Sequence, residues 1–293
     1  MKKIHGTGVA LVTPFTTEGV LDIPALEKLV EHVISGGVDY LVPLGTTGES
    51  VTLTKDEKDA VLSTVIRVNN GRRPVVLGLG GNNTHELLQL LKTQDFRGVD
   101  AILSVSPYYN KPTQEGIFQH YLAIGEASPV PVILYNVPGR TGSNILPETT
   151  LRLANACKNI VAIKEASGNL EQMMLIIKNK PTGFEVISGD DNLTLPLIAA
   201  GGIGVISVVA NVYPETYSAM VRDSLAGDFK SASAKHYRLF DFVNLLFKDG
   251  NPGGAKLALK NLGICGEAVR LPLAPVGAST AQAIAQEVAR LKA

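Results

Sequence analysis

Residues 160–208 read IVAIKEASGNLEQMMLIIKNKPTGFEVISGDDNLTLPLIAAGGIGVISV. Three short apolar runs alternate in this stretch with two segments of helical spacing. The apolar runs are continuous and rich in Val and Ile, which is typical of strands whose two faces are both covered in a parallel sheet. The stretch therefore predicts a β-α-β-α-β unit. Its strands are predicted at Ile160–Lys164, Glu185–Ser188 and Gly204–Val208, and its helices at Asn169–Lys178 and Leu193–Ala200.

The same alternation extends through the rest of the chain. Further strands are predicted at Thr7–Thr13, Tyr40–Pro43, Val75–Gly78, Ala101–Val105 and Val132–Tyr135. Further helices are predicted at Ile23–Ser35, Lys55–Val68, Thr84–Thr93, Gln114–Ala127, Pro147–Ala156 and Tyr213–Ala226. Eight strands and eight helices in strict alternation predict an α/β fold, a (β/α)8 TIM barrel over residues 1–226. Patterns at Phe229–Lys248, Gly254–Leu262 and Thr280–Lys292 predict a C-terminal three-helix extension over residues 227–293.

Two other architectures fit the sequence less well. A doubly wound open sheet needs a glycine-rich turn after its first strand, whereas here that strand is followed by Thr13-Pro14-Phe15. The segment Leu193–Tyr213 has no charged residue and is long enough to cross a bilayer. Pro196 and the cluster Gly201–Gly204 interrupt it, so a short helix, a glycine turn and a buried strand are predicted there instead.

Composition excludes several classes of partner. The 293 residues carry 27 Lys and Arg against 27 Asp and Glu, a net charge of zero, without the basic patch that nucleic-acid binding requires. Two cysteines, Cys157 and Cys265, make no disulfide framework and favour a reducing, cytoplasmic compartment. The five histidines lack metal-ligand spacing. Adjacent Asp190 and Asp191 diverge, and Asp191 is predicted to cap the following helix, so no metal site is expected.

Lys164 is the strongest catalytic candidate. It ends a buried strand, and barrel chemistry is found at the C-terminal ends of the strands. An ammonium group that loses its hydration there is driven towards the neutral amine, which attacks ketones and forms a Schiff base. The alternative is a structural lysine paired with a carboxylate such as Glu165. Because adjacent strand residues point to opposite faces, that pair is not expected.

The loop Gly45-Thr46-Thr47-Gly48 offers two hydroxyls and several amides at the predicted start of a helix. Such a loop suits a small carboxylate or phosphate, although a plain capped turn has the same composition. The phenols of Tyr109 and Tyr135 could relay a proton through Thr46, or could simply pack as amphipathic side chains.

Arg140 lies in the loop Pro138-Gly139-Arg140-Thr141-Gly142. Its guanidinium could clamp a carboxylate through two hydrogen bonds. A solvated surface arginine explains the same residue equally well.

Three motifs now support a family resemblance: Gly45-Thr46-Thr47-Gly48-Glu49, the run from Tyr135 to Thr141 (YNVPGRT), and Lys164-Glu165-Ala166-Ser167-Gly168. In order and spacing they resemble the pyruvate-dependent class I aldolase/lyase family of dihydrodipicolinate synthase and N-acetylneuraminate lyase, over essentially the whole chain. Arg140 and the threonine pair resemble the dihydrodipicolinate synthase branch, because the corresponding loop of the sialic-acid lyases lacks this arginine.

The resemblance implies a reaction, in the diaminopimelate route of lysine biosynthesis. Lys164 would condense with pyruvate to an imine and then an enamine, which attacks L-aspartate-4-semialdehyde; the amine of that substrate then displaces the lysine and closes a ring. The implied catalytic residues are Lys164, Tyr135, Thr46 and Tyr109, and the implied substrate-binding residues are Thr47, Arg140, Gly189 and Ile206. Thr47 would hold the pyruvate carboxylate, Gly189 and Ile206 would line the pyruvate pocket through their backbones, and Arg140 would bind the carboxylate of the aldehyde.

The resemblance also implies self-association and regulation. Tyr109 would reach into the neighbouring subunit of a homodimer or homotetramer, and no metal or organic cofactor would be needed. In some relatives lysine inhibits at the dimer interface, where the matching positions are Ser50, Val51, Asn82, Glu86 and Tyr108. Lys55 and Lys58 replace the histidines of inhibited relatives. Two extra cations should weaken lysine binding by ~1 kcal/mol each, so weak or absent inhibition is predicted.

Two other functions remain open from the sequence. The first is another pyruvate-dependent aldolase, acting on sialic acid or on a keto-sugar acid. The second is a ligand-binding barrel without turnover, because one fold serves many functions.

Overall fold

A computed structural model describes residues 4–292 of the chain, and its central element is a parallel sheet. The strands are β1 Gly6–Ala10, β2 Tyr40–Val42, β3 Val76–Gly78, β4 Ala101–Val105, β5 Val132–Asn136, β6 Ile160–Glu165, β7 Glu185–Ser188 and β8 Gly204–Ser207. Their order is β2-β1-β8-β7-β6-β5-β4-β3, and β2 meets β3 through a single parallel bridge between Leu41 and Val75. The barrel is therefore nearly closed, and the predicted (β/α)8 fold is confirmed.

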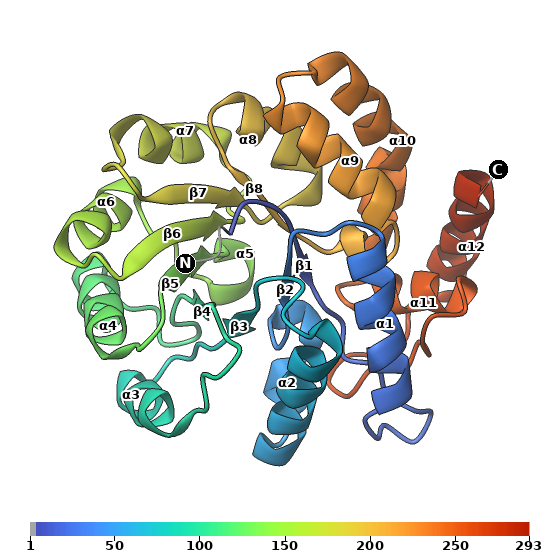
Figure 1. Cartoon of the computed structure of the whole chain (residues 1–293), viewed down its shortest axis with the longest axis horizontal. Coiled ribbons are helices and arrows are strands. Elements are labelled where there is room, and N and C mark those ends of the chain that lie inside the picture. Colours follow the sequence, from blue (N-terminus) through green and yellow to red (C-terminus); the bar gives the residue numbers. More distant parts are fainter. Residues whose placement is uncertain (1–3, 293) are drawn as a thin grey trace.

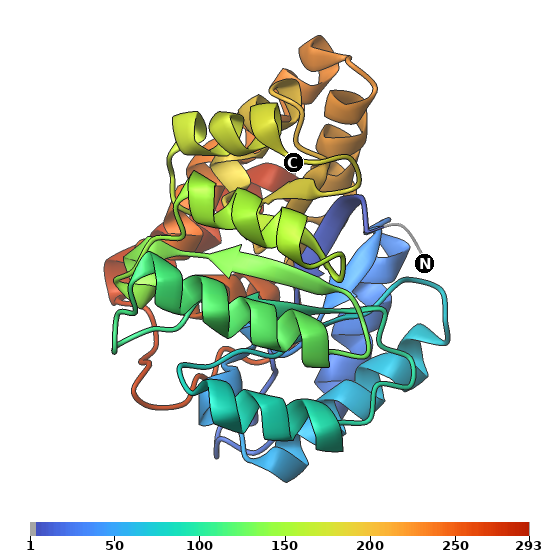
Figure 2. The same ribbon diagram turned by 90° about the vertical axis from the view of Figure 1, so that its left-hand side faces the viewer.

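An outer ring of helices surrounds the strands (Figure 1). The helices are α1 Ile23–Ser35, α2 Lys55–Asn69, α3 Thr84–Thr93, α4 Gln114–Ala127, α5 Pro138–Thr141, α6 Pro147–Ala156, α7 Leu170–Asn179, α8 Thr194–Ala199, α9 Pro214–Leu225, α10 Phe229–Phe247, α11 Gly253–Asn261 and α12 Ala278–Lys292. Seen from the side, α3, α4, α6 and α7 follow one another around the barrel (Figure 2). The three predicted C-terminal helices follow: α10 packs against α9, and α10, α11 and α12 pack against one another.

Several element ends differ from the predicted ranges, and one short helix was not expected. The first strand was expected to reach Thr13, but β1 ends at Ala10. The backbone N–H of Leu11 still donates to Val42 O at 3.1 Å, but that of Val12 donates to a side chain, Asn211 Oδ1, at 3.2 Å. Helix α5 was not predicted; it is one turn from Pro138 to Thr141, and the following Gly142, with a φ of 68°, stops it.

The segment Leu193–Tyr213 forms α8, β8 and short 3-10 turns, as expected from its proline and glycines. Between residues 4 and 292, no helix combines the length and the apolar character needed to cross a bilayer.

Strand alternation divides the apolar core into two layers. One lies inside the barrel and includes Ile133, Ala162 and Ile206, and the other lies between the strands and the helices and includes Ile163. Successive strand residues point to opposite faces. Lys164 therefore shares the interior face with Ala162, while Glu165 shares the helix-facing side with Ile163. This arrangement places one amine at the mouth of the barrel.

Candidate active site

Lys164 is buried at the C-terminal end of β6. Lys164 is 5% exposed, and it lies opposite Tyr135 of the neighbouring strand β5. The side chains lie together on the interior face, with Lys164 Nζ 4.3 Å from the centre of the Tyr135 ring. The ion pairs of the described residues do not include Lys164. The predicted buried amine, without a carboxylate partner, is therefore found.

Glu165 points away from that amine, as the strand alternation predicts. It is fully buried and accepts hydrogen bonds from Asn136 Nδ2 at 2.6 Å, Gln172 Nε2 at 3.0 Å and Ser167 Oγ at 2.5 Å. Burial raises the pKa of Glu165, and these donors oppose the rise. The network joins β5, β6 and α7 directly behind the Tyr135–Lys164 pair, so it fixes the strand ends that carry both side chains.

Gly189, which follows β7, lies directly against the lysine. Its backbone N–H donates to Glu165 O at 2.6 Å. A Cβ at this position would lie 3.0 Å from Lys164 Cε and 2.6 Å from Ala166 Cβ, so only glycine leaves the lysine room. Ile206 lies on β8, fully buried in the interior layer. Both residues therefore lie at the end of the barrel where Lys164 is found.

Asp190, which follows Gly189, interacts electrostatically with Lys164, and the sequence did not indicate this. Burial raises the pKa of its carboxyl, and the positive charge of Lys164 opposes this rise. Asp190 is thus an acidic group that faces the same end of the barrel as the amine.

The loop after β2 turns sharply before the next helix. Thr46–Gly48 forms a 3-10 turn and Glu49 follows with a left-handed φ of 52°. Thr47 is buried and Thr46 is exposed. The left-handed Glu49 interrupts the helical path, so this loop does not lead directly into a helix. Helix α2 begins at Lys55, where the predicted helix Lys55–Val68 starts. Thr13 Oγ1 donates to Gly48 O at 2.7 Å and holds the turn to the segment that follows β1.

The three hydroxyls of the predicted proton relay are not joined in one chain. Tyr135 is 7% exposed, whereas Tyr109 is 89% exposed and has a φ of 73°. Thr46 is exposed as well. No hydrogen bond within residues 4–292 connects these hydroxyls, so the relay stays a prediction. Arg140 is exposed on α5, beyond the end of β5.

The residues of the expected lysine site are only partly brought together. Asn82 Nδ2 donates to Tyr108 O at 3.1 Å, which joins two of them. Val51 is 81% exposed, Glu86 is exposed, and Ser50 is half-buried. A binding role for these residues stays a prediction.

Asp191 does not cap the next helix, so that prediction is wrong. Its carboxylate is buried and accepts hydrogen bonds from the backbone N–H groups of Val208 and Val209, both at 3.0 Å. The amides that follow β8 lack strand partners there and take the carboxylate instead, while Leu193 precedes α8. Among the residues described, no group of three or more His, Cys, Asp or Glu is placed to hold a metal ion.

Sequence reasoning missed a set of contacts from the C-terminal extension to the 45–49 loop. Asn251 Nδ2 donates to Thr47 Oγ1 at 2.9 Å, and Lys256 Nζ donates to Glu49 Oε1 at 2.5 Å. The only available signal was Lys256 itself, a lysine that stands between Ala255 and Leu257 in an apolar helix. Asn251 follows a helix rather than a strand, so the rule that places barrel chemistry at strand ends does not indicate it.

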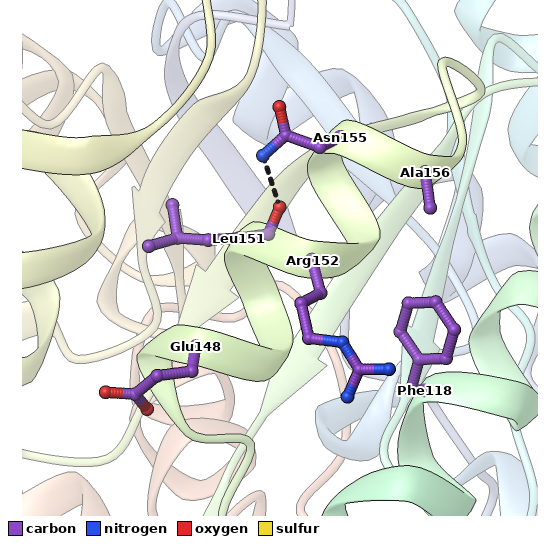
Figure 3. A pocket seen from close by; sticks show the side chains of 6 residues that line it. All are labelled: Phe118, Glu148, Leu151, Arg152, Asn155 and Ala156. Atoms are coloured by element: carbon purple, nitrogen blue, oxygen red, sulfur yellow. Dashed lines mark hydrogen bonds between the residues drawn. The ribbon is translucent and has the colours of Figure 1, made fainter.

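A surface hollow lies between α4 and α6, on the outside of the barrel (Figure 3). Its wall includes Arg152, whose guanidinium lies 4.2 Å from the centre of the Phe118 ring and also pairs with Glu115. These contacts support the packing of α4 against α6. The residues lining the hollow are Phe118, Glu148, Leu151, Arg152, Asn155 and Ala156.

Comparison with known proteins agrees with this geometry. Residues 3–291 match the model of the dihydrodipicolinate synthetase family. The chain is 56% identical to the 4-hydroxy-tetrahydrodipicolinate synthase of Flavobacterium psychrophilum, over 94% of each chain. It is 52% identical to the enzyme of the same name from Parabacteroides distasonis, over 98% of this chain and 97% of that one.

Among solved structures, the chain resembles the chloride-inhibited dihydrodipicolinate synthase of Acinetobacter baumannii, complexed with pyruvate. The TM-score is 0.96, the identity is 40%, and the match covers 99% of both chains. With a family match over nearly its full length and relatives more than half identical, the chain belongs to the dihydrodipicolinate synthetase family.

Proposed function

We propose that this chain is a 4-hydroxy-tetrahydrodipicolinate synthase, a lyase that condenses pyruvate with L-aspartate-4-semialdehyde in lysine biosynthesis by the diaminopimelate route. The observation that carries the proposal is Lys164, a buried amine without a carboxylate partner on the interior face of the barrel, next to Tyr135. The names of its relatives support the choice of substrates.

The chemistry follows from the position of the amine. Lys164 Nζ adds to the ketone of pyruvate, and loss of water gives an imine. Removal of a methyl proton converts the imine into an enamine, whose carbon bonds to the aldehyde of the second substrate. The amino group of that substrate then displaces Lys164, closes a six-membered ring and releases the enzyme unchanged. Tyr135, beside the amine, is the proposed group for proton transfer at these steps.

The other predicted residues divide between the two substrates. Thr47 binds the pyruvate carboxylate, and Gly189 and Ile206 line the pocket around the keto group. Arg140, free of side-chain partners in the described part of the chain, binds the carboxylate of the aldehyde.

A homodimer or homotetramer completes the relay. In such an assembly the side chain of Tyr109 extends into the neighbouring subunit and reaches the Thr46 hydroxyl of that subunit's site. The 89% exposure of Tyr109 in the single chain supports this arrangement. We place the enzyme in the cytoplasm, where Cys157 and Cys265, both free and buried, stay reduced.

Borohydride reduction with pyruvate, followed by mass mapping, tests the proposal. A pyruvyl adduct is expected on the peptide that contains Lys164. Lys164→Arg should abolish both adduct and turnover, while the matched variant Lys178→Arg, at an exposed lysine of α7, should retain both. An adduct on another lysine, or turnover by Lys164→Arg, would contradict the mechanism.

Kinetics identify the second substrate. Condensation with L-aspartate-4-semialdehyde is expected, and cleavage of N-acetylneuraminate is not. Arg140→Ala should raise the KM for the semialdehyde far more than the KM for pyruvate. Equal effects on both would remove Arg140 from its assigned role.

A further inference from the structure

The loop that carries Thr47 is held by a part of the chain far from it in sequence. Asn251 lies between α10 and α11, is 6% exposed, and donates its Nδ2 hydrogen to Thr47 Oγ1 at 2.9 Å across 204 positions. Lys256 of α11 reaches Glu49 at the other end of the same turn. The C-terminal extension therefore contacts the 45–49 loop at two side chains, one of which is a proposed substrate ligand.

The turn has little freedom to move away from these contacts. Gly48 lies where an added Cβ would meet Leu11 O at 3.1 Å, and its own carbonyl accepts from Thr13. On the far side, Glu49 Oε2 also accepts the backbone N–H of Arg270 at 3.0 Å. With the backbone fixed from both sides, the remaining variable is the rotation of the Thr47 hydroxyl.

Asn251 orients the Thr47 hydroxyl because its amide is the donor, and Thr47 Oγ1 the acceptor, in their hydrogen bond. A hydroxyl can both accept and donate. Because the amide N–H occupies a lone pair of Thr47 Oγ1, the hydroxyl hydrogen must point elsewhere. Within residues 4–292 no acceptor for that hydrogen is found. It is therefore available to a ligand, and a carboxylate oxygen is the acceptor that binds it most strongly.

We propose that Asn251 is a positioning residue for pyruvate: its amide holds the Thr47 hydroxyl as a preoriented donor to the carboxylate of the keto acid. The inference rests on the proposed function, since it takes Thr47 as the pyruvate ligand. It assigns the C-terminal extension a part in substrate binding that the barrel strands alone do not supply. Orienting a donor before the substrate arrives lowers the cost of binding.

Steady-state kinetics of Asn251→Ala test the proposal. Loss of one orienting hydrogen bond should raise the KM for pyruvate about tenfold and leave the KM for the semialdehyde within about twofold. At saturating pyruvate, borohydride should still label Lys164 completely. Asn261→Ala, at an exposed asparagine that ends α11, is the matched control and should behave as the wild type.

A second variant, Asn251→Asp, reports the direction of the hydrogen bond. The new carboxylate has the shape of the amide but cannot donate while ionised. It would turn the Thr47 hydroxyl towards itself, so the pyruvate KM should rise further than in Asn251→Ala. In a Thr47→Val background, removing the Asn251 amide should add less than about twofold, because the two residues act through one hydroxyl.

The outcomes separate this inference from the proposed function. A wild-type enzyme that gives no pyruvyl adduct overturns both. A normal wild-type adduct together with an unchanged pyruvate KM in Asn251→Ala or Asn251→Asp overturns the inference alone. Equal increases in the KM of both substrates, or full additivity with Thr47→Val, would also overturn it, because they indicate a general distortion of the fold.

Discussion

Replacing Lys256 by methionine should markedly lower the melting temperature (Tm) of the protein. Lys256 and Glu49 are both completely buried, and they form an ion pair at 2.5 Å. The ammonium group also donates to Ala268 O at 2.7 Å and lies 4.1 Å from the centre of the Phe15 ring. Burial lowers the pKa of Lys256, and the negative charge of Glu49 opposes that change. The pair is therefore stable only while both partners are present.

The size of the effect follows from what the substitution leaves behind. Methionine fills most of the volume, but the Glu49 carboxylate stays buried with the Arg270 backbone N–H as its remaining donor. Removing one partner of a buried pair costs about 3–5 kcal/mol. For 293 residues the entropy of unfolding is about 0.6 kcal/mol per K. A loss of about 4 kcal/mol therefore lowers Tm by about 6 °C.

Thermal unfolding followed by circular dichroism measures this shift. The matched control is Lys260→Met on the same helix, whose exposed ion pair with Glu267 should contribute less than about 1 kcal/mol. Adding Glu49→Gln to Lys256→Met removes the stranded charge and should restore most of the lost stability. The reasoning is refuted if Lys256→Met unfolds at the same temperature as Lys260→Met, or if the double variant is no more stable than the single one.

Three further outcomes follow from individual residues. Gly189→Ala should reduce kcat at least about a hundredfold with a smaller change in Tm, because its Cβ would displace Lys164 Cε; wild-type rates of borohydride trapping in this variant would contradict the reasoning. Burial lowers the pKa of His120 to about 4 from an ordinary 6.5. Between these two pH values the unfolded chain therefore binds more protons than the folded chain. The free energy of unfolding should fall by about 3 kcal/mol as the pH drops from 6.5 to 4. Urea titrations of the wild type and His120→Gln check this, and equal pH slopes would disprove it. L-lysine at about 1 mM should leave the rate unchanged because of Lys55 and Lys58, and an inhibition constant well below millimolar would show otherwise.

The barrel could be predicted from sequence because its signal is local and repeated. Short runs such as Ile160–Lys164 are buried on both faces, so their composition alone marks them as parallel strands. The period-two alternation also separated Lys164 from Glu165 correctly. Both conclusions depend on neighbours in the chain, which a single sequence contains.

The contacts of the 45–49 loop could not be predicted in the same way. Glu49 and Lys256 are 207 positions apart, and no local pattern connects them. The failed prediction for Asp191 has the same origin, since its carboxylate bonds to amides 17 and 18 positions away rather than to its own helix. Long-range polar pairing depends on how the finished barrel brings loops together.

The hydrogen bonds from Asn251 and Lys256 to the 45–49 loop also affect the order in which parts of the chain fold. A contact between residues some two hundred positions apart requires closure of a long loop of the chain. Closing such a loop is slow compared with local helix formation. A polypeptide synthesised from its N-terminus can thus pair most of its strands before the loop of Thr47 acquires its final shape. Recovery of turnover during refolding should lag behind recovery of helical content, with the late phase set by docking of the C-terminal helices.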